Sequence, residues 1–270
     1  MVIIMDAMTV IPSDTAALRS HIESCLNQDL FSMVIHPTVD FRTGRVLTGE
    51  ALSRLHYPEH NAITADVFIP LLESMGLHSK FDRYVFRKCC IWMRQAAAEG
   101  RQFDRIDCNF SRKTLSQPDI VGDLIQIADS CEIPHSKLGI EITEWTCATD
   151  AQQIIKNLRQ LKEAGFRIIL DDYGSGVTSE TDLQNFPLDI VKIDCSLLRN
   201  TATEKGDEAF RTLVRRFISM GAEVVCEGIE TEAHDSFARE TGCHYGQGFL
   251  YFKPISHDKV FDLIQHRENP

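Results

Sequence analysis

Residues 167–172 read Arg-Ile-Ile-Leu-Asp-Asp, a short apolar run that ends in two carboxylates. An uninterrupted aliphatic run of this length is typical of a strand that is buried on both faces, as in a parallel sheet. Similar runs recur along the chain and alternate with longer stretches of helical periodicity, such as residues 150–163. This alternation predicts a mostly parallel sheet that is covered by helices.

Eight such runs define the expected architecture. Thr43 and Gly44 join the first two by a tight turn, which predicts a hairpin. Eight strands with helices between them favour an α/β fold of the TIM-like (β/α)8 barrel type. The expected strands are residues 32–39, 46–52, 106–110, 138–143, 167–170, 190–193, 223–226 and a weak one around Tyr245.

The chain of 270 residues is expected to form one main domain with a short segment before it. In that segment, Ser13 and Asp14 can cap a helix whose apolar residues recur at helical spacing. Neither a Pro/Ser-rich linker nor a low-complexity stretch interrupts the rest. We therefore expect an N-terminal segment with a covering helix over residues 1–30 and one domain over residues 31–270.

Composition excludes several classes of protein. A hydrophobic fraction of 43% and a charged fraction of 25% are those of a globular protein. The formal charge of -11 has the wrong sign for a DNA- or RNA-binding surface. The apolar N-terminus is too short for a membrane span, and the nine scattered cysteines form no C-x-x-C pair. These features predict a cytoplasmic protein with reduced thiols and no membrane insertion.

Polar side chains stand at or just beyond the carboxyl ends of most expected strands. In a parallel barrel these ends share one face, so the side chains should converge in a single pocket. Crowded carboxylates repel one another unless cations neutralise them, and oxygen ligands favour Mg²⁺ or Mn²⁺. The residues are Glu50, Asn109, Glu141, Asp171, Asp172, Lys192, Glu227 and Gln247.

The adjacent carboxylates of Asp171 and Asp172 favour a site for two metal ions and phosphodiester cleavage. In such a site Lys192 could orient the nucleophile, and Glu227 could accept its proton or bind the second ion. Any single acidic residue at a strand end is more often a helix cap or a surface residue. A glycoside hydrolase is another class of enzyme to consider, but its reaction needs only two carboxylates and gives no role to Asn109 or Lys192.

Seven motifs resemble those of the EAL-domain cyclic di-GMP phosphodiesterases, in the same order. The resemblance implies a TIM-like barrel with an antiparallel first strand, in agreement with the expected hairpin. It also implies hydrolysis of cyclic di-GMP to linear pGpG, two divalent cations and inhibition by Ca²⁺, and a homodimer. The motifs are GEALSR (49–54), CNFS (108–111), EITE (141–144), DDYGSG (171–176), VKID (191–194), CEGIET (226–231) and GCHYGQG (242–248).

The resemblance also assigns roles to individual residues. It implies that Lys192 contacts the nucleophilic water and that Glu144 tethers the loop after Asp172, with Thr178 or Ser179 as its partner. The implied ligands of the first metal are Glu50, Asn109, Glu141 and Asp171, and those of the second are Asp171, Asp172 and Glu227. The implied substrate contacts are His36, Leu52, Arg54, Asp194, Glu230 and Gln247.

Two departures from the family pattern bear on function. His36 stands where the family has a glutamine, and an imidazole that titrates near pH 6.5 is expected to tighten binding of an anionic ligand as the pH falls. Val177 and Glu180 are atypical in the loop GSGVTSETD, which in the family couples the metal site to dimerisation. The alternative function is therefore a catalytically weak EAL domain that acts as a cyclic di-GMP receptor or a protein-interaction module.

Overall fold

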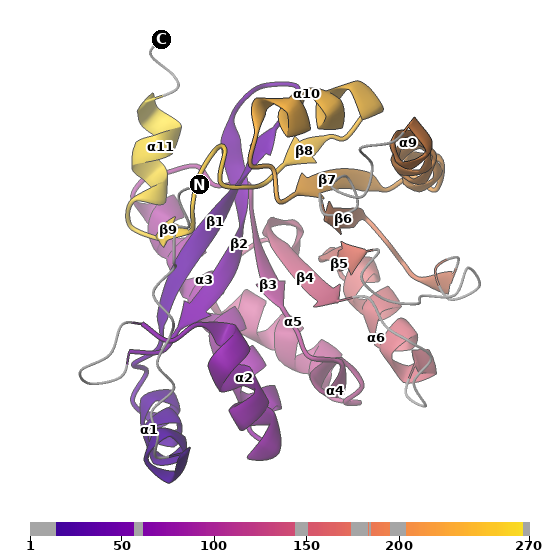
Figure 1. The fold of residues 1–270 in the computed structure, drawn as a ribbon. Coiled ribbons are helices and arrows are strands. Elements are labelled where there is room, and N and C mark those ends of the chain that lie inside the picture. Colours follow the sequence, from indigo (N-terminus) through magenta and orange to yellow (C-terminus); the bar gives the residue numbers. More distant parts are fainter. Residues whose placement is uncertain are drawn as a thin grey trace.

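The computed structural model describes residues 15–56, 62–143, 151–173, 183, 185–194 and 204–266. A closed barrel of eight strands forms its centre, with helices around the outside (Figure 1). A short ninth strand, β9 (Ile255–Ser256), pairs antiparallel with Val34 and Ile35 of the first. The barrel strands are β1 (Ser32–Asp40), β2 (Val46–Arg54), β3 (Arg105–Asn109), β4 (Leu138–Thr143), β5 (Arg167–Tyr173), β6 (Ile190–Asp194), β7 (Glu223–Glu227) and β8 (Tyr245–Gly246).

Strand directions confirm the expected barrel. Strands β2 to β8 pair in parallel in chain order, and β1 closes the barrel by antiparallel pairing with both β2 and β8. The hairpin between β1 and β2 follows from a local cap, because the Asp40 carboxylate accepts hydrogen bonds from the backbone N–H of Arg42 and Thr43 at 2.7 and 3.0 Å. Gly44 completes the turn with a φ of 69°, which glycine adopts without strain.

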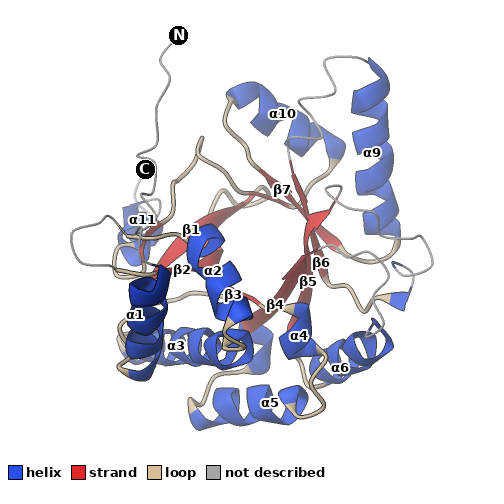
Figure 2. Ribbon diagram, turned by 60° about the horizontal axis from the view of Figure 1, so that its bottom comes forward, coloured by secondary structure: helices blue, strands red, loops and turns tan. Residues whose placement is uncertain are grey.

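Helices surround the barrel because each has one apolar face (Figure 2). On the helix before β5, Ile154, Leu158 and Leu161 recur at helical spacing and are buried. Burying each such side chain contributes about 1.5–3 kcal/mol. The helices are α1 (Thr15–Asn27), α2 (Ala65–Ser74), α3 (His78–Ala98), α4 (Arg112–Leu115), α5 (Ile120–Ser130), α6 (Ala151–Glu163), α9 (Glu204–Ser219), α10 (Glu232–Thr241) and α11 (Val260–His266), with a 3-10 turn at His135–Lys137.

The expected N-terminal helix is α1, and it shares the main hydrophobic core. Leu18, Ile22 and Leu26 are buried in the same cluster as residues of β1 and α2. Arg19 also donates a 2.8 Å hydrogen bond to the hydroxyl of Ser74 at the end of α2. Packing therefore joins α1 to the barrel across the boundary expected between residues 30 and 31.

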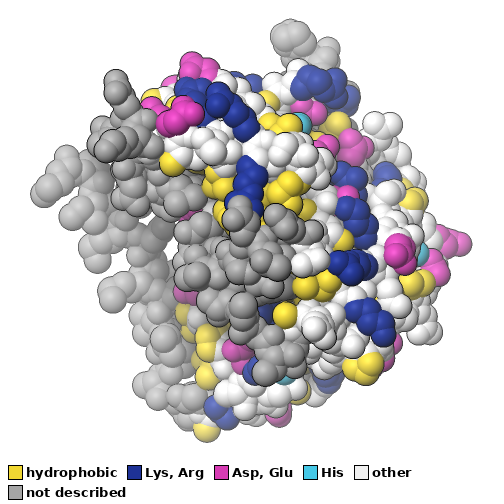
Figure 3. All heavy atoms as spheres, turned by 90° about the vertical axis from the view of Figure 1, so that its right-hand side faces the viewer, with side chains coloured by type: hydrophobic (Ala, Val, Ile, Leu, Met, Phe, Trp, Pro, Cys, Tyr) yellow, Lys and Arg dark blue, Asp and Glu magenta, His cyan; other side chains and the backbone are white. Residues whose placement is uncertain are grey.

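The described cysteines agree with the expected reduced thiols. All seven cysteines in the described ranges are free and buried, while Cys147 and Cys195 lie outside those ranges. None of the described helices combines the length and apolarity that a bilayer crossing requires. On the face seen in Figure 3, several groups of Lys and Arg side chains follow one another on the right, with Asp and Glu side chains beside them.

Candidate active site

Lys192 on β6 lies at the centre of the polar cluster at the carboxyl ends of the strands. Its Nζ lies 2.8 Å from Oε1 of Glu227 on β7 and 3.0 Å from Oδ1 of Asp171 on β5. It lies 3.1 Å from Oε2 of Glu50 on β2 and also hydrogen-bonds Oε1 of Glu141 on β4. The lysine is only 4% exposed. Four strands thus direct carboxylates at one buried ammonium, as the positions at the strand ends predicted.

Burial and mutual repulsion alter the acidity of the cluster. Burial, together with the charge of Glu50, raises the pKa of Glu141 well above its usual range, against the opposing charge of Lys192. Burial likewise raises the pKa of Glu227 to about 8. Burial also disfavours the charged form of Asp171, but the Lys192 ammonium prevails and holds the pKa of Asp171 below its usual range. One lysine therefore compensates these carboxylates only in part, and further positive charge is needed to ionise them all.

Adjacent Asp171 and Asp172 both reach the site because β5 is irregular there. In a regular strand, consecutive side chains point to opposite faces of the sheet. The pairing of β5 with β6 shifts register between Leu170 and Tyr173, and Asp172 has a φ of 53°, in the left-handed region. Oxygen atoms of Asp171, Asp172 and Glu227 consequently lie within 4.8 Å of one another. The irregularity converts two sequence neighbours into two groups of one site.

The oxygen atoms of this cluster are suitable ligands for divalent cations. Oε2 of Glu141 is buried and has no hydrogen-bond partner among the described residues, and the buried Oδ1 of Asp171 lies 3.0 Å from the lysine nitrogen. Buried acceptors of this kind are costly unless a donor or a cation satisfies them. Asn109 adds an amide whose Nδ2 donates to Oε1 of Glu50 at 2.6 Å. Carboxylate and amide oxygens are the ligands that Mg²⁺ and Mn²⁺ prefer.

His36 lies on β1 directly opposite Glu50 of β2, beside the cluster. Its Nε2 is buried without a hydrogen-bond partner in the part of the chain that the structure describes, and its ring centroid lies 6.1 Å from that of Phe249. Burial, and then the charge of Lys192, lowers the pKa of His36 to about 4. The expectation that this imidazole gains a proton near pH 6.5 is therefore wrong. It rested on an unperturbed histidine, and sequence does not reveal the burial that changes it.

Gln247 and Phe249 occupy the loop after β8. Gln247 is 1% exposed, and its Nε2 donates to the backbone carbonyl of His36 at 3.0 Å, so the side chain fastens this loop to β1. Phe249 is 54% exposed beside His36 and was not expected from the sequence as a site residue. The only indication in the sequence is that this aromatic residue lies two positions after Gln247, a predicted site residue. A large exposed aromatic ring at the rim of a polar pocket suits contact with a planar group.

Other predicted residues lie further from the lysine. Leu52 and Arg54 lie near the end of β2, and Nη1 of Arg54 donates to the carbonyl of Ser53 at 2.9 Å. Asp194 ends β6, and Glu230 is exposed after β7. Their substrate contacts stay predictions. Glu144, Thr178, Ser179 and the atypical loop residues Val177 and Glu180 lie outside the described residues.

The raised pKa of Glu227 predicts how metal-free stability depends on pH. A carboxyl whose pKa is about 8 when folded and 4.5 when unfolded binds its proton more strongly in the folded protein. Its contribution to stability is complete below pH 4.5 and is lost as the pH rises through 8. Thermal unfolding in EDTA should therefore show a falling Tm over this range, and Mn²⁺ should oppose the fall. Glu227→Gln should flatten the profile, and an unchanged slope in that variant would exclude Glu227 as the cause.

Comparison with known proteins shows the family of the chain. The EAL domain family model matches residues 17–254. A cyclic di-GMP phosphodiesterase of Pseudomonas aeruginosa, PA2567, is 29% identical over 238 residues, which are 87% of this chain and 40% of the relative. An uncharacterized signaling protein of Caulobacter vibrioides is 33% identical over 255 residues, 92% of this chain and 31% of that protein. The chain thus spans two fifths or less of the length of these relatives.

Solved structures agree with the sequence comparison. The PaMucR phosphodiesterase in complex with c-di-GMP superimposes with a TM-score of 0.82 at 28% identity, covering 90% of this chain and 99% of that one. The EAL domain of Mycobacterium smegmatis DcpA gives a TM-score of 0.74 at 26% identity, over 87% of this chain and 98% of that one. The match to the family model covers most of the sequence, and the barrel is closed in the same way. The chain therefore belongs to the EAL domain family.

Proposed function

We propose that this chain hydrolyses cyclic di-GMP to linear pGpG with the help of two divalent cations, Mg²⁺ or Mn²⁺. The observation that carries the proposal is the convergence of Glu50, Glu141, Asp171 and Glu227 on Lys192, with Asp172 brought alongside by the irregularity in β5. Further support comes from a related protein named as a cyclic di-GMP phosphodiesterase and from a similar structure that holds c-di-GMP.

The residues divide into two sets of metal ligands. Glu50, Asn109, Glu141 and Asp171 would hold one cation, and Asp171, Asp172 and Glu227 the other. Bound divalent cations supply charge neutralisation at a phosphate and a lower pKa for a bound water. The raised pKa of Glu141 and Glu227 agrees with this role, because these groups release their protons fully only when positive charge is added nearby.

Lys192 would act as a hydrogen-bond donor and a fixed positive charge. Burial alone would lower the pKa of Lys192, but the surrounding carboxylates hold it well above its usual value. The Nζ therefore keeps its protons and does not serve as the base. It would orient the attacking water, while His36, Leu52, Arg54, Asp194, Glu230 and Gln247 form or support the pocket for the nucleotide. The proposed reaction adds one water across one P–O bond of the cyclic substrate.

Metal dependence and product identity test the proposal together. Incubation with cyclic di-GMP and Mn²⁺ should yield linear pGpG, detected by ion-pair chromatography. Excess EDTA should abolish the reaction, and Ca²⁺ should inhibit it because that ion prefers longer bonds and looser coordination. Undiminished turnover in EDTA would contradict the two-metal site. Binding of cyclic di-GMP without any pGpG would instead identify a receptor. The expected homodimer stays a prediction that sedimentation velocity can check.

Replacement of His36 tests the proposed pocket from its other side. Because the pKa of His36 is about 4, its ring should stay neutral, and the cyclic di-GMP affinities of wild type and His36→Gln should change in parallel between about pH 7.5 and 6. Isothermal titration calorimetry at constant metal concentration measures both proteins. Extra tightening of the wild type alone at low pH would show that the ligand or the cations restore a higher pKa to this histidine.

A further inference from the structure

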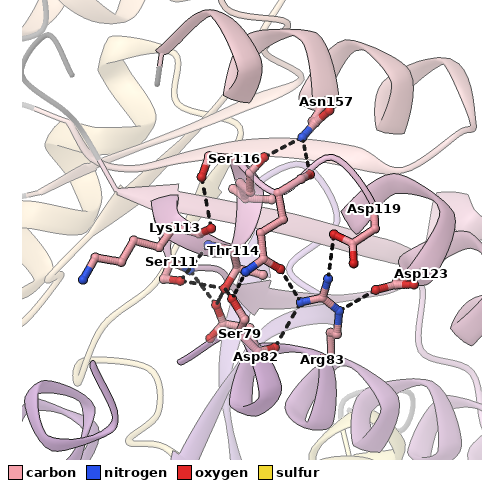
Figure 4. A network of polar contacts seen from close by, with 12 residues as sticks. Ser79, Asp82, Arg83, Ser111, Lys113, Thr114, Ser116, Asp119, Asp123 and Asn157 are labelled. Carbon is pink, nitrogen blue, oxygen red and sulfur yellow. Dashed lines mark hydrogen bonds and ion pairs between the residues drawn. The ribbon is translucent and has the colours of Figure 1, made fainter. Parts of the chain in front are cut away.

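Helix α4 is a four-residue helix that begins three residues after Asn109. A helix this short is not stable by itself, so its place depends on contacts with its neighbours. Figure 4 shows it between two longer helices, with Asp82 reaching it from α3 and Asn157 from α6, while Arg83 of α3 reaches Asp119 and Asp123 beyond its end. Ser111 caps it locally, since its Oγ accepts from the backbone N–H of Thr114 at 3.2 Å.

Asp82 anchors the start of α4 by two hydrogen bonds. Its Oδ2 accepts one hydrogen bond from the backbone N–H of Ser111 at 2.9 Å and another from the hydroxyl of Thr114 at 2.5 Å. Asp82 is 7% exposed and Thr114 is fully buried. A carboxylate in such a place is expensive unless donors satisfy it. Burial raises the pKa of Asp82, and the hydrogen bonds from Thr114 and Ser111 oppose that shift.

This anchor lies two residues from a proposed metal ligand. The backbone N–H of Phe110, between Asn109 and Ser111, donates to the carbonyl of Glu141 at 2.8 Å. Asn109 thus ends a strand that is fixed by the sheet on one side and by Asp82 on the other. Its Nδ2 donates to Glu50 at 2.6 Å, so a shift of the Asn109 backbone would disturb two members of the cluster.

We propose that Asp82 is a positioning residue that holds Asn109 in the orientation needed to bind the first divalent cation. The inference rests on the proposed function, since it assumes that Asn109 is a ligand. Asp82 itself touches neither the cation nor the substrate. Its part is to fix the start of α4, and through it the end of β3.

Asn157 provides a matched control at the other end of the same helix. It is 2% exposed, and its Nδ2 donates to the backbone carbonyls of Leu115 and Gln117, both at 2.8 Å. Like Asp82, it makes two hydrogen bonds to the α4 segment. The carbonyls it binds lie six and eight residues beyond Asn109, so its loss should loosen α4 without moving Asn109.

The first experiment compares Asp82→Ala with Asn157→Ala by calorimetric titration with Mn²⁺ and by thermal unfolding. Both variants should lose stability, because each leaves buried hydrogen-bonding groups without a partner. Only Asp82→Ala should weaken Mn²⁺ binding, by about 10- to 100-fold, as partners that orient metal ligands do. In Asn157→Ala the affinity should stay within about twofold of wild type, as expected for an independent site. Equal affinity losses in the two variants would overturn the proposal.

A double-mutant cycle with Asn109→Ala tests whether Asp82 acts through Asn109. If it does, adding Asp82→Ala to Asn109→Ala should cause little further loss of Mn²⁺ affinity. Additive losses would overturn the proposed route. Asp82→Asn should restore most of the affinity, because an amide oxygen can accept both hydrogen bonds.

Thr114→Val removes one of the two donors to Asp82 at nearly constant volume and serves if Asp82→Ala does not fold. It should also weaken Mn²⁺ binding more than Asn157→Ala does, and unchanged affinity would contradict the proposal.

The titrations also separate this inference from the function on which it rests. If the wild type binds Mn²⁺ and forms pGpG while Asp82→Ala binds Mn²⁺ equally well, only the role of Asp82 is contradicted. A wild type that does neither would remove the proposed function.

Discussion

Asp171→Asn is expected to slow cyclic di-GMP hydrolysis by more than about 100-fold. Loss of a residue that only orients a metal ligand typically costs about 10- to 100-fold, and Asp171 is itself a proposed ligand. Asp171 belongs to both proposed metal sites and lies 3.0 Å from the lysine nitrogen, so no other side chain duplicates its place. The amide has the same shape but lacks the charge that binds a cation. Initial rates at saturating Mn²⁺ and substrate measure the effect.

The same change should leave the fold intact. The amide keeps the shape of the side chain but loses the attraction to Lys192 that lowers the pKa of Asp171, so the Tm of metal-free Asp171→Asn should fall only modestly below that of wild type. Asp189→Asn is the control, because Asp189 accepts from the backbone of Ile168 at 2.9 Å and lies 3.1 Å from Lys162, at the opposite ends of the strands. That variant should lose stability but keep its rate per folded molecule. Equal rates in wild type and Asp171→Asn would reject the assignment.

Lys192→Met should lower the free energy of unfolding of the metal-free protein by about 3–5 kcal/mol at neutral pH. The ammonium contacts four carboxyl groups and is only 4% exposed, so its removal leaves those that are ionised uncompensated in the barrel. Adding Mn²⁺, or lowering the pH until the carboxylates take up protons, should restore much of the loss. Urea unfolding with and without Mn²⁺ measures both effects.

Lys88→Met is the matched control for that measurement. Lys88 also bonds a carboxylate, with its Nζ 2.9 Å from Asp29, but it lies on the outside of α3, where the side chains of the pair are 27% and 70% exposed. Such a surface pair contributes about 1 kcal/mol or less, the 2.9 Å hydrogen bond from Lys88 to the carbonyl of Phe31 contributes about as much, and Mn²⁺ should compensate neither loss. If the two lysine variants lost equal stability, or if Mn²⁺ rescued neither, the charge balance proposed for the barrel would be wrong.

The sequence predicted the barrel well because one pattern carried most of the information. Parallel strands are buried on both faces, so they appear as apolar runs, and the polar residues that follow them must share one end of the barrel. That reasoning places the carboxylates and Lys192 in one small volume at that end. It missed β9 because a two-residue strand has no periodicity to detect.

Features that depend on burial or on irregular backbone could not be predicted in this way. The low pKa of His36 comes from the surroundings of the ring, which belong to several distant segments. Asp82 lies on a helix that carries several other charged residues, and nothing in the sequence shows that Ser111 and Thr114 lie against it. The adjacent carboxylates of Asp171 and Asp172 indicated a metal site, but not the shift in strand pairing that lets both reach it.

The left-handed backbone at Asp172 makes the site easier to lose in evolution than to regain. A side chain at such a position costs on the order of 1–2 kcal/mol, less for aspartate than for most residues, and glycine does not incur this cost. A lineage released from selection for catalysis could therefore exchange this aspartate for glycine in one step with little loss of stability. The reverse step would require a folded protein to accept that cost before any ligand returned. Decay of activity in this barrel is thus favoured by the same backbone geometry that brings its two neighbouring carboxylates together.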